Sequence, residues 1–200
     1  MEQQFTQING NEIAYIGDLS SINIIFIIGR SNSNKYSAPL DSLLNKLCYK
    51  NYLVIWPNWP KHEKDFEFND HLQLCKGLLI FLGHHRSITI LSHSVGGRIA
   101  ANLAHHIHIK RIICFGYPFK HPEEPEDIKR TAVLEGIQTP VLIIQGRFDE
   151  YGGADVQEKY HLSTSVEMVN VDSNHDYEHL SHSDWDLVIN NVGQFIEVKN

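Results

Sequence analysis

The chain has 200 residues, enough for a sizeable core, and we expect a single domain over residues 1–200. Its formal charge is −7, and no basic patch stands out among the 17 Lys and Arg residues, so a nucleic-acid partner is not expected. The N-terminus has no apolar signal core, and three cysteines (Cys48, Cys75, Cys114) are widely spaced in apolar runs, which predicts a cytoplasmic protein with free thiols and no membrane partner.

The N-terminal segment predicts a β-hairpin. Two alternating stretches, 5–8 and 12–16, flank Asn9-Gly10, a dipeptide that favours a type I′ turn. The most hydrophobic strand candidate, 22–28, follows. Strands and helices are then expected to alternate: a helix face from Leu40 to Cys48, a strand Tyr52–Trp56, a helix Phe66–Leu82, a strand Ile88–Leu91, a helix around Ile99–Ile107, strands Arg111–Gly116, Pro140–Gly146 and Val166–Val171, and a C-terminal helix around Trp185–Ile196.

The middle strands of this pattern are almost continuous runs of Val, Ile and Leu, as expected of strands that are buried on both faces. Their alternation with helices predicts an α/β fold. We therefore expect a mostly parallel central sheet with helices on both faces and an antiparallel N-terminal hairpin.

Residues 92–97, Ser-His-Ser-Val-Gly-Gly, separate a predicted strand from a predicted helix, which is the context of a nucleophile elbow. A serine on such a strained turn needs small residues two positions away on either side, and Ser94 has Ser92 and Gly96 there. The common first glycine of this motif is replaced by Ser92. A simple helix N-cap is the alternative role for Ser94.

Two polar residues that follow later strands complete a candidate triad. Asp149 follows the strand that ends at Gly146, and His175 follows the last predicted strand. The order Ser, Asp, His is the chain order of the α/β-hydrolase triad, in which a base activates the hydroxyl and an acid orients the base. Alternatives remain open: Glu150 or Asp155 as the acid, and His179 as the base.

Four stretches carry a resemblance to a known family: Ser94-Val95-Gly96-Gly97-Arg98, Phe115-Gly116-Tyr117-Pro118-Phe119 with Pro122, Thr139 to Asp149 with Gly152, and Asn174-His175-Asp176. From about residue 20 to residue 200, the chain resembles a small, lidless α/β-hydrolase of the dienelactone-hydrolase-like kind. It is most similar to the hydrolase-like domain of the testis-expressed and NSL-complex-subunit group and its bacterial relatives. The resemblance implies the α/β-hydrolase fold and the triad Ser94, Asp149 and His175.

An oxyanion hole is expected from the backbone N–H groups of Val95 and Arg30. The loop at Arg30 departs from the family, because such hydrolases usually carry His-Gly and further glycines there. Arg30 could instead bind a substrate carboxylate or remain a solvated loop charge. Trp56 and Tyr117 are candidate substrate-binding residues, and Trp59 and Phe119 could join them in an acyl pocket, although aromatic residues after strands are as often part of the core.

The segment between Gly116 and Pro140 is short and mostly polar, so we expect no lid and an open site. The sequence therefore predicts a serine hydrolase that cleaves an ester or thioester of a small soluble substrate through an acyl-enzyme, with no cofactor and no metal. Two alternatives remain: a hydrolase-fold binding or scaffold protein, and a metal enzyme that uses His175, His179 and His182. A homodimer is left open.

Overall fold

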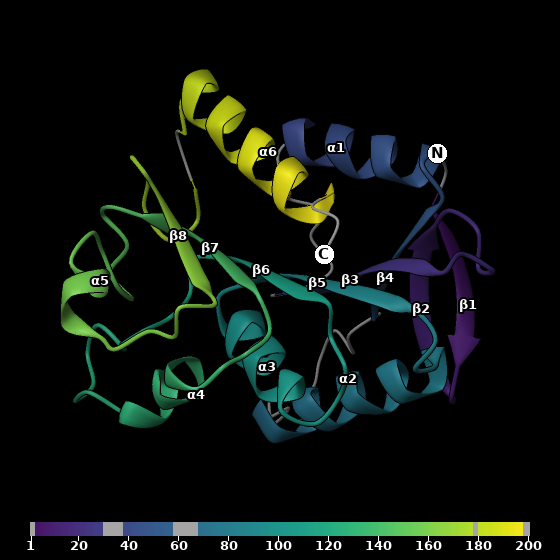
Figure 1. The fold of residues 1–200 in the computed structure, drawn as a ribbon, viewed down its shortest axis with the longest axis horizontal. Coiled ribbons are helices and arrows are strands. Elements are labelled where there is room, and N and C mark those ends of the chain that lie inside the picture. The colour runs from purple at the N-terminus through teal and green to yellow at the C-terminus, as the bar shows by residue number, and fades with distance from the viewer. Residues whose placement is uncertain (1–2, 30–37, 58–67, 178–179, 198–200) are drawn as a thin grey trace.

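The computed structural model describes residues 3–29, 38–57, 68–177 and 180–197. Its centre is an eight-stranded sheet with the strand order β1-β2-β4-β3-β5-β6-β7-β8 (Figure 1). The strands are β1 (Gln4–Ile8), β2 (Asn11–Ile16), β3 (Asn23–Ile28), β4 (Tyr52–Pro57), β5 (Ser87–His93), β6 (Arg111–Phe115), β7 (Val141–Gly146) and β8 (Val166–Val171). The longer helices are α1 (Ala38–Tyr49), α2 (Phe68–Leu82), α3 (Val95–Ala104) and α6 (His182–Glu197).

The first two strands form the predicted hairpin. Ile8 is paired with Asn11, and both turn residues have positive φ angles, 50° at Asn9 and 76° at Gly10, as a type I′ turn requires. β2 also pairs antiparallel with β4, whereas the pairs from β4 to β8 across the sheet are parallel. The prediction of a mostly parallel sheet with an antiparallel edge is confirmed.

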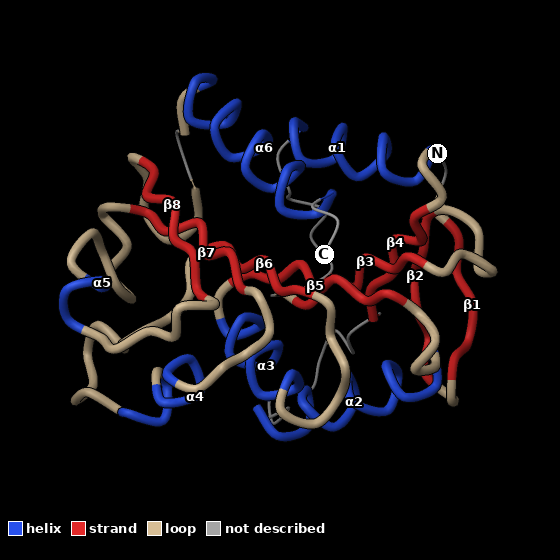
Figure 2. Tube along the Cα trace, in the orientation of Figure 1, coloured by secondary structure: helices blue, strands red, loops and turns tan. Residues whose placement is uncertain are grey.

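Helices cover both faces of the sheet (Figure 2). α1 and α6 lie together on one face, and α2 and α3 lie on the other. Each face has its own apolar core, the first around Leu47, Val54 and Val188, and the second around Leu78 and Ile99. Every residue of β6 and β7 is buried, which explains the continuous apolar runs that the sequence shows there. This α/β architecture, with helices on both faces of a mostly parallel sheet, is the one expected from the sequence.

Three short elements were not apparent from the sequence: η1 (Ile128–Arg130), α4 (Ala132–Glu135) and α5 (Val156–Lys159). Each has only three or four residues, too few to show a helical period. The side chain of Asp127 accepts a hydrogen bond from the backbone N–H of Lys129 at the start of η1. The connection between β6 and β7 is therefore ordered by local capping and by contacts of α4 with α3.

The carboxyl end of α6 is tied to the sheet by Arg111. This buried side chain, at the first position of β6, donates hydrogen bonds to the carbonyl oxygens of Phe195 and Ile196, the latter at 2.7 Å. A cation at the carboxyl end of a helix opposes the negative end of the helix dipole, so Arg111 stabilises the last turn of α6. Of the helices in the described ranges, none combines the length and hydropathy needed to span a membrane.

Gly77 in α2 allows a test of the fold that does not involve the candidate site. A Cβ atom at this position would lie 3.7 Å from its nearest neighbour, the side-chain nitrogen of Asn9, which is ordinary contact. Gly77→Ala is therefore expected to raise the free energy of unfolding by about 0.5–1 kcal/mol, because alanine loses less backbone entropy in a helix. Urea unfolding followed by circular dichroism measures this change, and a lower midpoint for the variant would contradict the packing of α2.

Candidate active site

Ser94 occupies a strained turn between β5 and α3. Its φ and ψ angles are 54° and −126°, in a region that residues other than glycine rarely adopt. The turn is possible because the neighbours are small. A Cβ atom at Gly96 would lie 2.3 Å from the carbonyl oxygen of Ile28 at the end of β3. Ser92 is fully buried, and its hydroxyl donates a hydrogen bond to the carbonyl of Ile113 at 3.0 Å.

The turn brings Ser94 to His175, which lies in the loop after β8. The Oγ atom of Ser94 is 2.8 Å from Nε2 of His175. On its other side, the imidazole Nδ1 lies 2.9 Å and 3.0 Å from the two carboxylate oxygens of Asp149. Ser94 occupies the N-cap position of α3, but its side chain makes no capping hydrogen bond there, so capping does not explain its hydroxyl.

The partners of His175 determine its tautomer. The carboxylate of Asp149 can only accept a hydrogen bond, so Nδ1 carries a proton and donates a hydrogen bond to Asp149. Nε2 is then unprotonated and accepts the hydrogen bond from the hydroxyl of Ser94. The imidazole is thus oriented to take a proton from Ser94, which is the arrangement that activates a serine nucleophile.

Asp149 is enclosed and fully hydrogen-bonded. Its side chain has no exposed surface. Oδ1 accepts the backbone N–H of Tyr151 at 2.8 Å, and Oδ2 accepts Nε2 of Gln145 at 2.8 Å. The alternative acids, Glu150 and Asp155, are both exposed, and the contacts to the imidazole come from Asp149.

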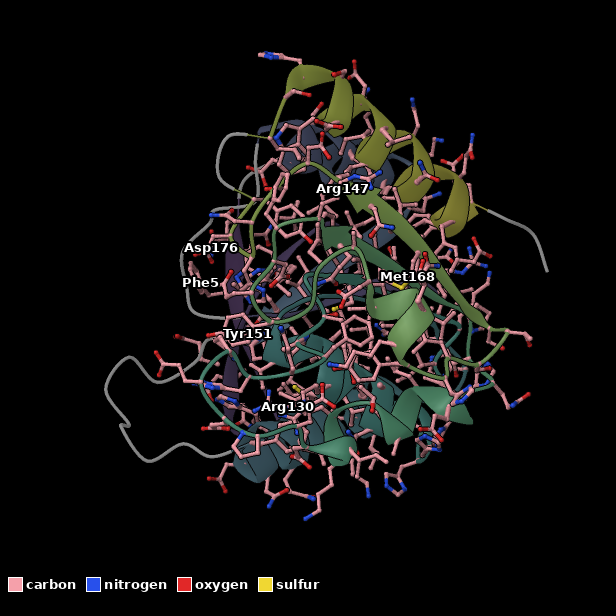
Figure 3. All side chains as sticks on the ribbon, turned by 90° about the vertical axis from the view of Figure 1, so that its left-hand side faces the viewer. Phe5, Arg130, Arg147, Tyr151, Met168 and Asp176 are labelled. Atoms are coloured by element: carbon pink, nitrogen blue, oxygen red, sulfur yellow. The ribbon has the colours of Figure 1, made fainter. Side chains whose placement is uncertain are left out.

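His175 is also held by contacts that sequence reasoning missed. Its carbonyl oxygen lies 3.0 Å from Nε2 of His93, which must donate because a carbonyl can only accept. Burial lowers the pKa of His93, which favours the neutral form of this neighbouring ring. The ring of Tyr151 lies 4.5 Å from that of His175. Tyr151 and Asp176, each close in sequence to a triad residue, lie on the same side of the molecule in Figure 3.

One of the two predicted oxyanion donors, the N–H of Val95, lies in the described part of the chain. Val95 is the first residue of α3, so its N–H belongs to the first helical turn, where amides have no acceptor within the helix. It follows Ser94 directly and lies at the positive end of the helix dipole. The second predicted donor, the N–H of Arg30, lies outside the described residues.

The two predicted substrate-binding residues lie in different surroundings. Tyr117 is 1% exposed, its hydroxyl donates to the carbonyl of Arg130 at 2.6 Å, and its ring lies 4.9 Å from that of Phe119. The prediction that Tyr117 contacts substrate is therefore wrong, since its side chain is part of the core. Trp56 is partly buried at the end of β4 and packs on the α1/α6 face, so its contact with substrate stays a prediction. Trp59 lies outside the described residues.

The alternative metal site predicted from the sequence involves His175, His179 and His182. In residues 3–29, 38–57, 68–177 and 180–197, no three His, Cys, Asp or Glu side chains are placed to hold a metal ion. His179, a member of that cluster and the alternative base, lies outside these ranges. The imidazole of His175 instead contacts Ser94 and Asp149.

A family model described as "Alpha/beta hydrolase domain" matches residues 63–196. The chain belongs to this α/β-hydrolase family. Among curated proteins, no match was found. Solved structures that resemble this α/β-hydrolase over nearly its whole length have low sequence identity, so their likeness concerns the fold.

Three of these structures illustrate the likeness. A lidless α/β serine hydrolase from Xanthomonas campestris has a TM-score of 0.71 at 12% identity, covering 100% of this chain and 97% of its own. An α/β serine hydrolase homologue from Coxiella burnetii has a TM-score of 0.70 at 18% identity, covering 96% and 97%. A thioesterase domain from the curacin biosynthetic pathway has a TM-score of 0.69 at 12% identity, covering 99% of both chains.

Proposed function

We propose that this α/β-hydrolase is a serine hydrolase that cleaves an ester or thioester bond through an acyl-enzyme. The observation that carries the proposal is the unbroken row of hydrogen bonds from Ser94 through His175 to Asp149, with distances of 2.8 Å and 2.9 Å. These residues come from three separate loops at the carboxyl ends of parallel strands, where catalytic groups collect in this class of sheet.

Each residue of the row has a defined role in the proposed reaction. Ser94 Oγ attacks the carbonyl carbon while its proton moves to Nε2 of His175. The imidazolium is stabilised by Asp149, and it returns the proton to the departing alcohol or thiol as the bond to the acyl group breaks. A water molecule then attacks the acyl-enzyme with His175 again acting as the base, which releases the acid and restores the hydroxyl of Ser94.

The negative oxygen that forms during each attack needs hydrogen-bond donors. We assign one of them to the N–H of Val95, which the first turn of α3 leaves without an acceptor in its own helix. The N–H of Arg30 is the proposed second donor. These steps are carried out by the chain's own groups and require no cofactor.

A small soluble ester or thioester is the substrate class that we favour. The connection from β6 to β7 holds only η1 and α4, and α4 contacts α3 on the α2/α3 face of the sheet. Such a short connection supports an open site. The resemblance to lidless hydrolases of the dienelactone-hydrolase-like kind, and to the testis-expressed and NSL-subunit group within them, supports the same class.

Turnover of p-nitrophenyl acetate and labelling by a fluorophosphonate probe test this proposal. The wild type should react with both reagents, and Ser94→Ala should lose labelling and nearly all turnover, because the attacking oxygen is removed. Mass spectrometry of the labelled wild type should place the adduct on Ser94. Equal labelling of both proteins would reject serine catalysis and would favour the alternative of a binding protein built on this fold.

A further inference from the structure

We propose that Gln145 is a positioning residue that clamps the triad carboxylate of Asp149; this inference rests on the proposed serine-hydrolase function. Gln145 is the only amide side chain in the strand β7, whose other members are apolar or glycine. It has no exposed surface. A buried polar group costs free energy unless its hydrogen bonds are made, so its partners indicate why it is there.

All the polar atoms of the Gln145 amide have partners. Nε2 donates to Oδ2 of Asp149 at 2.8 Å and to the carbonyl oxygen of Gly152 at 2.6 Å, with the carbonyl of Tyr117 at 3.4 Å. Oε1 accepts the backbone N–H of Tyr117 at 3.0 Å. If the amide were flipped, its oxygen would face the carboxylate of Asp149, which is also an acceptor. Its NH₂ group would then face the backbone N–H of Tyr117, which is also a donor, so one orientation is fixed.

The amide therefore joins three segments that meet at the site. β7 supplies Gln145 itself, the loop after β6 supplies Tyr117, and the turn from Asp149 to Gly152 supplies the carboxylate and the carbonyl. Gly116, just before Tyr117, leaves little room beside the triad, because a Cβ atom there would lie 3.1 Å from Nδ1 of His175. The hydrogen bonds of Gln145 therefore connect the loop after β6 with the turn that carries Asp149.

The clamp has a chemical consequence for His175. Asp149 receives three donors: the N–H of Tyr151, the amide of Gln145 and Nδ1–H of His175. Hydrogen bonds to a carboxylate disperse its charge and fix its orientation. Without the Gln145 donor, Oδ2 would hold the proton of His175 more tightly, and the carboxylate would be less firmly oriented. The base would then retain its second proton to higher pH.

A purely structural role would produce a different result. Gln145 also satisfies buried backbone groups at Tyr117 and Gly152, so its loss must lower stability in any case. A structural role alone would reduce the amount of folded protein but leave the pH profile of each folded molecule unchanged. The pH profile per active site therefore separates the two roles.

The experiment compares the full-length wild type with Gln145→Leu and Ser163→Ala. Leucine keeps much of the volume of glutamine but has no donor. Ser163→Ala is the matched control, because the hydroxyl of Ser163 donates to the carbonyl of Ile137 at 2.7 Å before β8 begins, away from the triad. Active sites are counted by fluorophosphonate labelling at completion, and kcat/KM for p-nitrophenyl acetate is measured from pH 5 to about pH 9.

For Gln145→Leu we expect kcat/KM per active site to fall on the order of tenfold, the effect of about 1.4 kcal/mol. The acidic limb of its pH profile should move to higher pH by about half a unit to one unit. Ser163→Ala should melt at a lower temperature with an unchanged profile. A Gln145→Leu profile identical to that of the wild type, whatever its melting temperature, would overturn the proposal.

A second readout works without turnover. The Nδ1 proton of His175 should give a downfield NMR resonance in the wild type, and Gln145→Leu should shift it while Ser163→Ala should not. An unmoved resonance in Gln145→Leu would overturn the clamp. The serine-hydrolase proposal fails by a separate criterion, equal labelling of the wild type and Ser94→Ala, so the two failures can be distinguished.

Discussion

Asp149→Asn is expected to lower kcat by about 10⁴-fold, the loss seen when a triad carboxylate is replaced by an amide. The carboxylate of Asp149 is surrounded by donors, from Tyr151, Gln145 and His175. An asparagine must turn its NH₂ group toward one of them. If the NH₂ faces Nδ1, His175 must carry its proton on Nε2 and can no longer accept the proton of Ser94.

The same substitution should also lower the free energy of unfolding by about 1–3 kcal/mol, because any orientation of the new amide sets a buried donor against another donor. Rates measured with p-nitrophenyl acetate, together with thermal unfolding, separate the two effects. The kinetic loss should be far larger than the fraction of unfolded protein can explain.

Asp155→Asn is the control for this experiment. Asp155 is exposed before α5, and its side chain makes no capping hydrogen bond, so activity and stability should both remain close to those of the wild type. A comparable loss of activity in Asp155→Asn and Asp149→Asn would contradict the assignment of the triad acid.

Gly96→Ala is expected to damage both the fold and the site. Its Cβ would lie 2.3 Å from the carbonyl oxygen and 2.9 Å from the carbonyl carbon of Ile28, so α3 and β3 must separate. Overpacking of this kind costs about 1–3 kcal/mol of stability. Because Ser94 and Val95 lie just before Gly96 in the chain, the shift should also misplace the nucleophile and lower kcat/KM by about 10²-fold.

Gly77→Ala supplies the matched comparison, since it adds the same methyl group to another helix where space is available. The melting temperature should rise in Gly77→Ala and fall in Gly96→Ala. The value of kcat/KM should fall only in Gly96→Ala. Wild-type activity and stability in Gly96→Ala would mean that β3 and α3 do not approach as closely as the structure shows.

The order of strands and helices could be predicted from the sequence, because buried parallel strands leave continuous apolar runs and the hairpin has an Asn9-Gly10 turn. The triad could be nominated for a related reason. Polar residues that follow parallel strands collect at one edge of the sheet, and Ser94, Asp149 and His175 each follow such a strand. Their contacts required the structure, since spacing along the chain does not give distances between loops.

The remaining features depend on which segments meet in space. The burial of Tyr117 depends on its contacts with Phe119 and Arg130, and an aromatic residue after a strand could equally have faced solvent. The contacts of Gln145 involve two other loops, so its sequence offers only one signal: a polar residue within an otherwise apolar strand. His93 could have been considered because it precedes Ser94, although nothing in the sequence places it against the carbonyl of His175.

β8 is the last strand in the chain and an edge strand of the sheet, and His175 follows it. This position affects when the proposed chemistry can begin. During translation, the hydroxyl of Ser94 and the carboxylate of Asp149 leave the ribosome before the imidazole that must join them. A nascent chain that has emerged only as far as Asp149 would therefore lack the base and could not carry out the proposed hydrolysis. In the mature molecule, detachment of this edge strand would displace His175 and stop the proposed reaction while the central strands remain paired.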